Sequence, residues 1–395
     1  MNFEQITKEI NEIYEDIVRF RRELHKIPEL SGKERETSRK VAEKLKDLPL
    51  TIRENVGGNG ILAELTGGKP GRTILLRADM DALPIAEDTG LAYSSEHPGA
   101  MHACGHDMHT AMLTGIATVL SKHKEELAGT VKFMFQPAEE LSPTGGSRAM
   151  MEAGILENPK VDEAYAMHVF GVPTGTIAFR PGVANSRSDR IEIVITGKSA
   201  HGSLPNEGAD AIVAAAGVVT TLQSIISRNL GPSENAVITI GKINGGDRYN
   251  VIPDKVILEG TVRTFSDEVV NRIKSRLGNI VKDIAAAHGC AGELHYYDGY
   301  DFIWNDPDLS QKLIGSLTPL LGKENIRIQE FPLPTGEDFS FVTKKVPSVF
   351  FWIGTECAAN KGKCILHNAK FTPDEETIRT GMNIMCKLVC DRMSL

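Results

Sequence analysis

Short apolar runs rich in β-branched residues alternate with helix-like segments through the first part of the chain, and this alternation restricts the fold more than any other feature. The strand-like runs lie in TILLRADMDALP, TVKFMFQPAEE and EAYAMHVF, with helix-like segments between them. Such alternation favours an α/β sheet with parallel strands. Apolar residues at helical spacing from Phe3 to Leu24 predict an opening amphipathic helix, which the segment IPELSGKE ends.

The pattern changes near residue 186. From there the segments follow the order strand–helix–strand–strand–helix–strand, which is typical of a small α+β sandwich. After about residue 300, the run PSVFFWIG and a closing helix return to the first pattern. Because 395 residues exceed the size at which one core keeps growing, two domains are expected. We predict a discontinuous first domain of residues 1–185 and 300–395, with residues 186–299 inserted as a second domain.

Charge and cysteine usage narrow the class of protein. The chain has 44 basic and 52 acidic residues, a net charge of −8 and no long block of one sign. This balance argues against nucleic acid or an anionic membrane as the main partner. The charged N-terminus lacks a signal-peptide core, and no apolar stretch approaches membrane-spanning length. Six scattered cysteines without a CxxC pair indicate reduced thiols and a cytoplasmic protein.

The segment MHACGHDMHT concentrates possible metal ligands. Cys104 and His106 are two residues apart, so in an extended segment their side chains leave the same face. A thiolate and an imidazole on one face form a natural half-site for zinc or a similar metal. Buried cysteines and surface histidines are common, however, so the pair alone does not decide the matter. The apolar run that follows predicts a helix whose first turn holds the cluster.

The segment FQPAEE places Glu139 and Glu140 after a strand that an α/β sheet would bury. Adjacent side chains diverge, so a single metal ion is not expected to bind both. A division of roles fits better, in which one carboxylate is a ligand and the other a general base. A solvated acidic strand end is the alternative interpretation.

Other strand ends carry further candidates. His168 lies within an apolar strand, His367 lies in a loop near the C-terminus, and Asp79 and Asp81 follow another apolar strand. Taken singly, these residues could be a core histidine, a loop histidine and turn-forming aspartates. Because α/β sheets place active sites at the carboxyl ends of their strands, one dinuclear metal site explains all of these residues together. Without such a site, each of these residues would need a separate explanation.

The same residues lie in motifs of a known family. The chain resembles the dinuclear-metal amidohydrolases related to aminoacylases and glutamate carboxypeptidases, and within them the hippurate hydrolases, N-acyl-L-amino acid amidohydrolases and auxin-conjugate hydrolases. The resemblance runs over nearly the whole chain. The motifs that carry it, in order, are RRELHKIPELSGKE, LRADMDALPI, MHACGHDMHTAMLTG, FQPAEE, GKSAHGSLPNEGADAI, NVIPD, GTVRTF, GEDFSF and HNAKF.

The resemblance implies a fold and a site. The expected fold is a mixed-sheet metallopeptidase-like catalytic domain with an inserted ferredoxin-like sandwich that serves as lid and dimerisation surface. Two divalent metal ions per subunit are implied, zinc first, with manganese, cobalt or nickel as alternatives. Glu139 would be the catalytic carboxylate, Asp81 would orient a ligand, and the role of Asp79 stays open. The implied ligands are Cys104, His106, Glu140, His168 and His367, and their implied neighbours are His102, Asp107 and His109.

Three residues of the second domain match family positions that contact substrate. By the resemblance, His201 would reach the active site of a neighbouring subunit in a homodimer and hydrogen-bond the oxyanion. Asn250 and Arg263 would contact the substrate and its carboxylate, for which a guanidinium is well shaped. Without the resemblance, these residues read as a surface-loop histidine, a turn former and a strand-surface charge.

The function implied is hydrolysis of the amide bond of a small N-acyl-L-amino acid, with Glu139 as general base toward a water that the metals activate. Alternatives are a carboxypeptidase or dipeptidase with the same metal centre, and a deacetylase of an acetylated diamino acid. Thiol catalysis by Cys104 is a rival mechanism. A metal-binding protein without activity is disfavoured, because every proposed ligand is kept together with Glu139.

Overall fold

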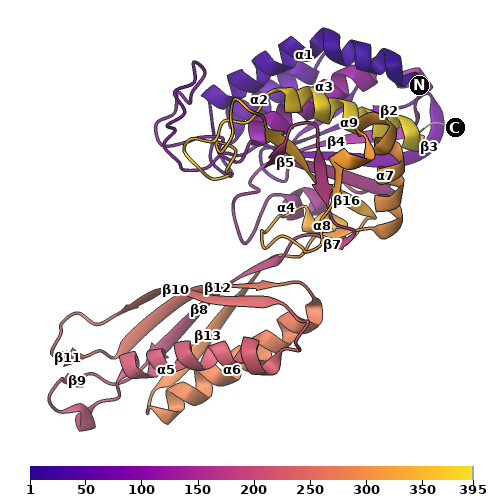
Figure 1. The fold of residues 1–395 in the computed structure, drawn as a ribbon. Helices are drawn as coiled ribbons and strands as arrows, with labels where there is room; N and C mark the ends of the chain where they lie inside the picture. Colours follow the sequence, from indigo (N-terminus) through magenta and orange to yellow (C-terminus); the bar gives the residue numbers. More distant parts are fainter. Residues whose placement is uncertain (394–395) are drawn as a thin grey trace. The chain divides into compact units, whose positions relative to one another are not determined.

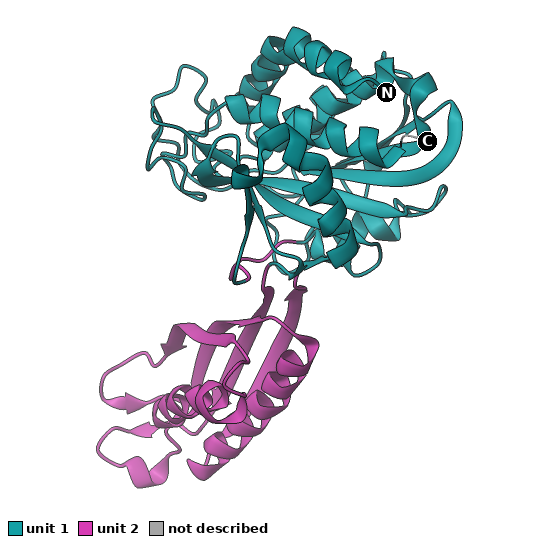
Figure 2. Ribbon diagram, turned by 45° about the vertical axis from the view of Figure 1, so that its right-hand side comes forward, with its two compact units in different colours: residues 1–184, 303–331, 338–395 teal, residues 185–302, 332–337 magenta. Residues whose placement is uncertain are grey.

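The computed structural model describes residues 1–393, and the chain divides into two compact units (Figure 2). Unit 1 consists of Met1–Ala184, Ile303–Phe331 and Asp338–Leu395, and unit 2 of Asn185–Phe302 and Pro332–Glu337. The chain therefore leaves unit 1, forms unit 2 and returns. A short piece of the returning chain, Pro332–Glu337, also belongs to unit 2.

Unit 1 is built on an eight-stranded mixed sheet in the order β1-β2-β4-β3-β5-β16-β6-β15. The central strands β4, β3, β5 and β16 are parallel, as the alternation of strands and helices predicts, whereas β1, β2 and β6 add antiparallel pairs. Every residue of β4 is buried, in keeping with a strand covered on both faces. The strands are β1 Thr51–Val56, β2 Gly60–Thr66, β3 Lys69–Asp79, β4 Ala128–Gln136, β5 Glu163–Pro173, β6 Ile177–Phe179, β15 Ile326–Ile328 and β16 Ser348–Glu356.

Helices α1, α3 and α9 pack on one another, and α3 and α9 contact the central strands (Figure 1). The amphipathic helix α1 begins after Asn2, whose side chain accepts a hydrogen bond from the N–H of Glu4, and it buries an apolar stripe that includes Ile10 and Leu24. The helices of unit 1 are α1 Phe3–Lys26, α2 Arg35–Leu45, α3 His106–Lys122, α4 Ser147–Glu152, α7 Pro307–Leu321, α8 Ser340–Thr343 and α9 Glu376–Met393, and the short strands β7 Gly182–Val183 and β14 Trp304–Asn305 pair separately.

Unit 2 is a four-stranded antiparallel sheet, in the order β10-β12-β8-β13, with α5 and α6 packed on it (Figure 1). Its own hydrophobic core joins the sheet to both helices. The long elements follow the predicted order, and the unit is the inserted ferredoxin-like sandwich. They are β8 Arg187–Thr196, α5 Ala211–Ser224, β10 Ala236–Gly245, β12 Lys255–Thr264, α6 Asp267–Ala287 and β13 Ala291–Tyr300, with the short pair β9 Ala200–His201 and β11 Val251–Ile252.

One stretch of unit 2, Ala211–Asn229, is long and apolar enough to cross a membrane by length and composition, with 19 residues and a mean hydropathy of 1.4. The expectation that no apolar stretch approaches that length is therefore wrong. Val218 and Leu222 are buried in the core of unit 2, so one face of this helix already packs against protein. Ile212 and Val213 lie exposed near its start.

Candidate metal centre

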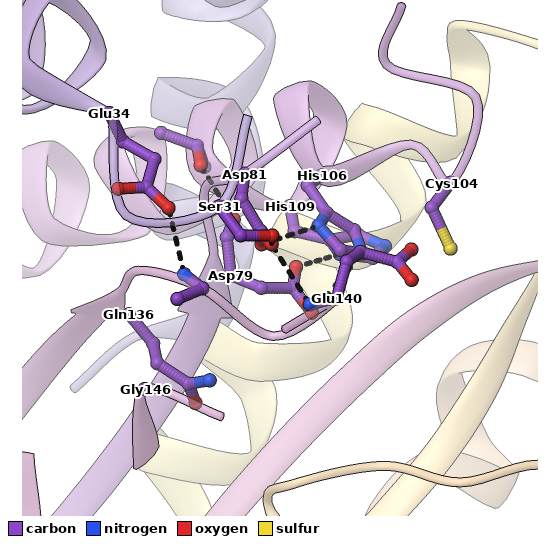
Figure 3. A network of polar contacts seen from close by, with 12 residues as sticks. Ser31, Glu34, Asp79, Asp81, Cys104, His106, His109, Gln136, Glu140 and Gly146 are labelled. Atoms are coloured by element: carbon purple, nitrogen blue, oxygen red, sulfur yellow. Dashed lines mark hydrogen bonds and ion pairs between the residues drawn. The ribbon is translucent and has the colours of Figure 1, made fainter. Parts of the chain in front are cut away.

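The Cys104–His106 segment enters α3 through a tight turn. The predicted helix begins at His106, the first residue of α3, but the residues before it are not extended, because Cys104 lies in a turn and Gly105 has a φ of +81°. A Cβ on Gly105 would lie 2.4 Å from the Val169 side chain, so glycine serves both the left-handed backbone and the close packing. The two side chains still converge: Cys104, His106 and Glu140 each place a ligand atom within 4.8 Å of the others (Figure 3).

His106 is oriented by a carboxylate. Its Nδ1 lies 3.2 Å from Oδ1 of Asp81, while its buried Nε2 has no hydrogen-bond partner (Figure 3). Burial lowers the pKa of His106, but the charges of Asp79 and Asp81 outweigh burial and raise it to about 10. An imidazole bound to a carboxylate through one nitrogen, with the other nitrogen free, is the usual arrangement of a metal-ligating histidine.

His168 and Cys104 face each other from β5 and the turn before α3. Nδ1 of His168 lies 2.8 Å from the carbonyl oxygen of Val169, and its Nε2 lies 3.4 Å from Sγ of Cys104. Burial, followed by the charges of Glu140 and Glu139, raises the pKa of the Cys104 thiol well above its ordinary value. A divalent cation at this point would reverse that effect, because a coordinating thiol is deprotonated.

His367 completes the donor set. It has a φ of +59°, and its N–H donates to the carbonyl oxygen of Ala103 at 2.9 Å, which fixes the loop against the turn before α3. Its Nε2 lies 3.1 Å from Oε1 of Glu140. Soft sulfur, imidazole and carboxylate donors around one point, with a buried ring nitrogen of His106 that has no hydrogen-bond partner, fit a zinc-like divalent cation. The structure thus brings together the residues expected as ligands.

A second group with metal-binding chemistry, Asp79, His106, His109 and His168, lies beside the first. Both nitrogens of His109 are already engaged, since Nδ1 lies 2.5 Å from Oδ1 of Asp79 and Nε2 accepts the N–H of Val169 at 2.9 Å. This tautomer leaves no lone pair on His109 for a metal. His109 is therefore a structural neighbour rather than a ligand in this geometry.

Asp79, whose role the sequence leaves open, is bound from both sides. Its Oδ2 accepts a hydrogen bond from Nη1 of Arg77 at 2.6 Å, while its Oδ1 faces His109. Burial raises the pKa of Asp79, but Arg77 and the neighbouring histidines outweigh burial and hold the pKa well below its ordinary value. Asp79 thus orients His109, whose other nitrogen in turn holds the backbone of β5 beside His168.

Glu139 lies in the turn after β4, between Ala138 and Glu140, and is buried at 7% exposure. Ala138 has a φ of +57°, an unusual backbone conformation for a residue with a side chain. A carboxylate oxygen of Asp338 lies within 4.8 Å of one of Glu139. Asp338 itself accepts hydrogen bonds from the backbone N–H groups of Gly146 and Ser147, so it holds the segment that follows this turn.

Asp107 points away from the donor set into a buried charge cluster. Its Oδ2 lies 2.7 Å from Nε of Arg21 and 2.7 Å from Nδ1 of His25, both on α1. His102 is buried nearby, and burial lowers its pKa to about 4. The sequence analysis missed Arg21 and His25; their position on the apolar stripe of α1, four residues after Ile17 and one after Leu24, is the signal that marks them as buried.

The second-domain candidates lie in unit 2, but not at one point. His201 and Val251 pair across β9 and β11, and the N–H of Gly202 donates to the carbonyl oxygen of Asn250 at 2.9 Å, so His201 and Asn250 share one loop pair. His201 is exposed, and its Nδ1 accepts the N–H of Ser203 at 3.1 Å. Arg263 lies at the far end of β12 from this pair, with its pKa lowered by burial.

The comparisons with known proteins agree on one family. The model of peptidase family M20/M25/M40 matches residues 75–391. An N-acetyl-L-cysteine deacetylase from Bacillus subtilis is 38% identical over 371 residues, 93% of this chain and 86% of that protein. Thermostable carboxypeptidase 1 from Saccharolobus solfataricus is 35% identical over 383 residues, 96% of this chain and 95% of that protein. A dinuclear metal-binding M20 peptidase from Bacillus subtilis has a structure with a TM-score of 0.83 and 34% identity, covering 97% of this chain and 99% of that chain.

A mixed α/β sheet with buried sulfur, imidazole and carboxylate donors at its strand ends, together with an inserted sandwich, defines the class as a metal-dependent hydrolase. The chain belongs to peptidase family M20/M25/M40, whose members include amidohydrolases, deacetylases and carboxypeptidases. This membership confirms the resemblance to the dinuclear-metal amidohydrolases and carboxypeptidases that the motifs carry.

Proposed function

We propose that the chain hydrolyses the amide bond of N-acyl-L-amino acids, releasing a carboxylic acid and a free amino acid. The observation that carries the proposal is the division of roles within the turn after β4. Glu140 lies 3.1 Å from His367 and within reach of Cys104 and His106, whereas the neighbouring Glu139 is outside that ligand group. We therefore assign the role of ligand to Glu140 and that of proton transfer to Glu139.

Cys104, His106, Glu140, His168 and His367 would hold two divalent ions. When bound, such ions polarise the amide carbonyl and lower the pKa of water. Glu139 removes the proton from the attacking water as its oxygen bonds to the carbonyl carbon, and then gives that proton to the leaving amine nitrogen as the C–N bond breaks. Asp81 holds His106 through Nδ1 and leaves its Nε2 to the metal.

Thiol catalysis by Cys104 is less well supported. A nucleophilic cysteine needs a lowered pKa, and here burial and the carboxylates of Glu140 and Glu139 raise it. A trapped acyl-enzyme on Cys104 would favour the thiol mechanism. Protection of Cys104 from alkylation by added metal supports ligation.

We propose that His201, Asn250 and Arg263 contact the substrate, and that the chain forms a homodimer through unit 2. The strand β10 is an edge of the sheet of unit 2 and carries exposed Val237 and Ile243. Exposed apolar residues on an edge strand are a ready pairing surface for a second copy. A cytoplasmic location agrees with cysteines that are all free in the structure.

A hydrolysis screen tests the function. Purified protein is incubated with N-acetyl-, N-benzoyl- and indole-acyl-amino acids, an acetylated diamino acid and dipeptides, each with zinc, manganese, cobalt or nickel, and free amine is measured. We expect turnover of acyl amino acids that a chelator removes and metal restores, with up to two ions per chain by elemental analysis. Turnover of dipeptides alone would indicate that the chain is a carboxypeptidase or dipeptidase. Chelator-insensitive turnover by metal-free protein would refute the metal centre.

A further inference from the structure

We propose that Glu34, in the loop between α1 and α2, is a positioning residue that holds the turn carrying Glu139 and Glu140 in its working conformation. Glu34 is fully buried, although a carboxylate is rarely found inside a protein without a specific partner. The proposal rests on the proposed function, because it assigns a role toward the general base of that reaction.

The carboxylate of Glu34 binds the turn directly. One oxygen, Oε1, accepts the N–H of Ala138 at 2.9 Å and the N–H of Gly32 at 2.7 Å, and Oε2 accepts the side-chain amide of Asn59 at 3.0 Å. A buried carboxylate that accepts several N–H groups stabilises each of them strongly. Glu34 is thus fixed by the loop and by Asn59, and it reaches across to the residue before Glu139.

Ala138 is the residue that needs this support. Its φ of +57° lies in the left-handed region, which an alanine enters at a cost in energy. The hydrogen bond from its N–H to Glu34 offsets that cost only in the observed conformation. Strained backbone persists where its surroundings determine it, and such positions gather at active sites. If the N–H of Ala138 lost its partner, the turn would relax and Glu139 would change direction.

The same loop holds the other end of the turn. The hydroxyl of Ser31 donates to Oδ2 of Asp81 at 2.6 Å, and that same oxygen accepts the N–H of Glu140 at 2.9 Å (Figure 3). Asp81 also holds His106, as described above. Glu139 therefore lies between two backbone anchors, and both lead back to the loop Ser31–Glu34.

A matched control lies in the same loop. The carboxylate of Glu29 accepts the N–H groups of Glu36 and Thr37, at 3.1 Å and 2.8 Å, and so supports the start of α2. Among the described residues, this carboxylate binds Glu36 and Thr37 and not the turn after β4. Loss of Glu29 should lower stability without changing the direction of Glu139, which separates a structural effect from a positioning effect.

The experiment compares Glu34→Ala, Glu34→Gln and Glu29→Ala with the wild type, at saturating metal. We expect Glu34→Ala to lower kcat roughly 10- to 100-fold, the scale of a misplaced catalytic group, with KM and metal content close to wild type. Glu34→Gln should keep most of the activity, because its amide oxygen can still accept the N–H of Ala138. Glu29→Ala should keep kcat while its Tm falls.

Rescue provides a test that a merely structural role would fail. Adding Ala138→Gly to Glu34→Ala should recover at least about threefold in kcat, since glycine adopts a positive φ without the cost that alanine bears. An equal loss of kcat in Glu34→Ala and Glu29→Ala, in proportion to their Tm values, would overturn the proposal. If Glu34→Ala fails to fold, two single variants replace it in the comparison. They are Glu34→Gln and Asn59→Ala, the second of which removes the side-chain amide that binds Oε2 of Glu34.

Crystal structures keep this proposal separate from the proposed function. We expect Ala138 to leave the positive-φ region in Glu34→Ala and Glu139 to move with it. If the wild type hydrolyses none of the substrates, the proposed function fails, but the structures still decide the role of Glu34. An unmoved Ala138 and Glu139 in the variant would refute the positioning role whatever the activity.

Discussion

Two histidines one helical turn apart, His106 and His109, have opposite roles because of what their second nitrogens bind. Asp81 takes one nitrogen of His106, and the other is buried without a hydrogen-bond partner, 3.6 Å from Oδ2 of Asp79. His109 has Asp79 on one nitrogen and the backbone of Val169 on the other. Sequence alone shows two equivalent imidazoles in MHACGHDMHT; the partners that distinguish them come from other strands.

Substitution of each histidine should separate ligand from neighbour. His106→Ala should lose metal on purification, because it removes a donor atom. His109→Ala should keep its full metal content at saturating metal, with affinity lowered about 10- to 100-fold, as is usual for groups that support a ligand. Elemental analysis measures the metal content of the two variants, and metal titration measures their affinity. If His109→Ala loses its ions and His106→Ala keeps them, the assignment of the metal centre is wrong.

Glu139→Gln should lower kcat roughly 10²- to 10⁴-fold, because an amide cannot take the proton from water. The substitution preserves size, and Glu139 lies outside the Cys104, His106 and Glu140 group, so metal content should stay at the wild-type level. Steady-state kinetics and elemental analysis of the same preparation measure both values. Near-normal turnover by Glu139→Gln would refute its role as general base.

At the scale of elements, α1 and α3 are joined by charges as well as by apolar side chains. Periodicity in the sequence predicts α1, but it does not show why the polar residues Arg21 and His25 are buried on its apolar stripe. The reason is their shared partner Asp107, which lies on α3, far along the chain. The left-handed Ala138 could not be predicted either. Alanine seldom adopts that conformation, and the carboxylate that accepts its N–H, that of Glu34, comes 104 residues earlier in the chain.

Arg21→Met should lower the free energy of unfolding by about 3–5 kcal/mol, because it leaves Asp107 buried with a charge that has lost its main partner. The matched control is Arg22→Met. Arg22 pairs with Glu375, which Arg21 also contacts at 3.3 Å, but 45% of the Arg22 side chain is exposed, so its loss should cost only about 0–1 kcal/mol. Urea unfolding of the metal-free proteins at pH 7 measures both.

The pH dependence of this pair follows from Asp107. Burial raises its pKa, but Arg21 and His25 outweigh burial and hold the pKa below its ordinary value. A lowered pKa in the folded state means that Asp107 contributes stability above about pH 4, the pKa of a free aspartate, and loses that contribution as the pH falls further. The difference between wild type and Arg21→Met should therefore persist at pH 6 and pH 8. It should be smaller at pH 6, because Arg21 lowers the pKa of His25, and in its absence a protonated His25 partly replaces it as the partner of Asp107. A difference that vanishes at either pH would contradict the ion pair.

At the scale of the whole molecule, the order of strands and helices was enough to predict a second, inserted α+β sandwich, because each unit keeps its own periodic pattern and its own core. The sequence also grouped the metal-ligand candidates, since parallel strands bring their carboxyl ends to one edge. It could not show that His201 and Asn250 lie in one loop pair at the start of β12, opposite Arg263. That grouping depends on the pairing of β9 with β11, which joins two segments far apart in the sequence.

The proposed dimer makes the role of His201 testable by complementation. Glu139→Gln and His201→Ala chains, each inactive or nearly so alone, are mixed and allowed to exchange subunits. In a symmetric dimer with His201 acting across the interface, each mixed dimer holds one complete site, so activity should recover to about a quarter of wild type at equal mixing. Recovery should disappear when Ile243→Asp is added to both chains to break the edge of β10, and light scattering should then show monomers. Mixed dimers without recovered activity would place His201 in the site of its own chain.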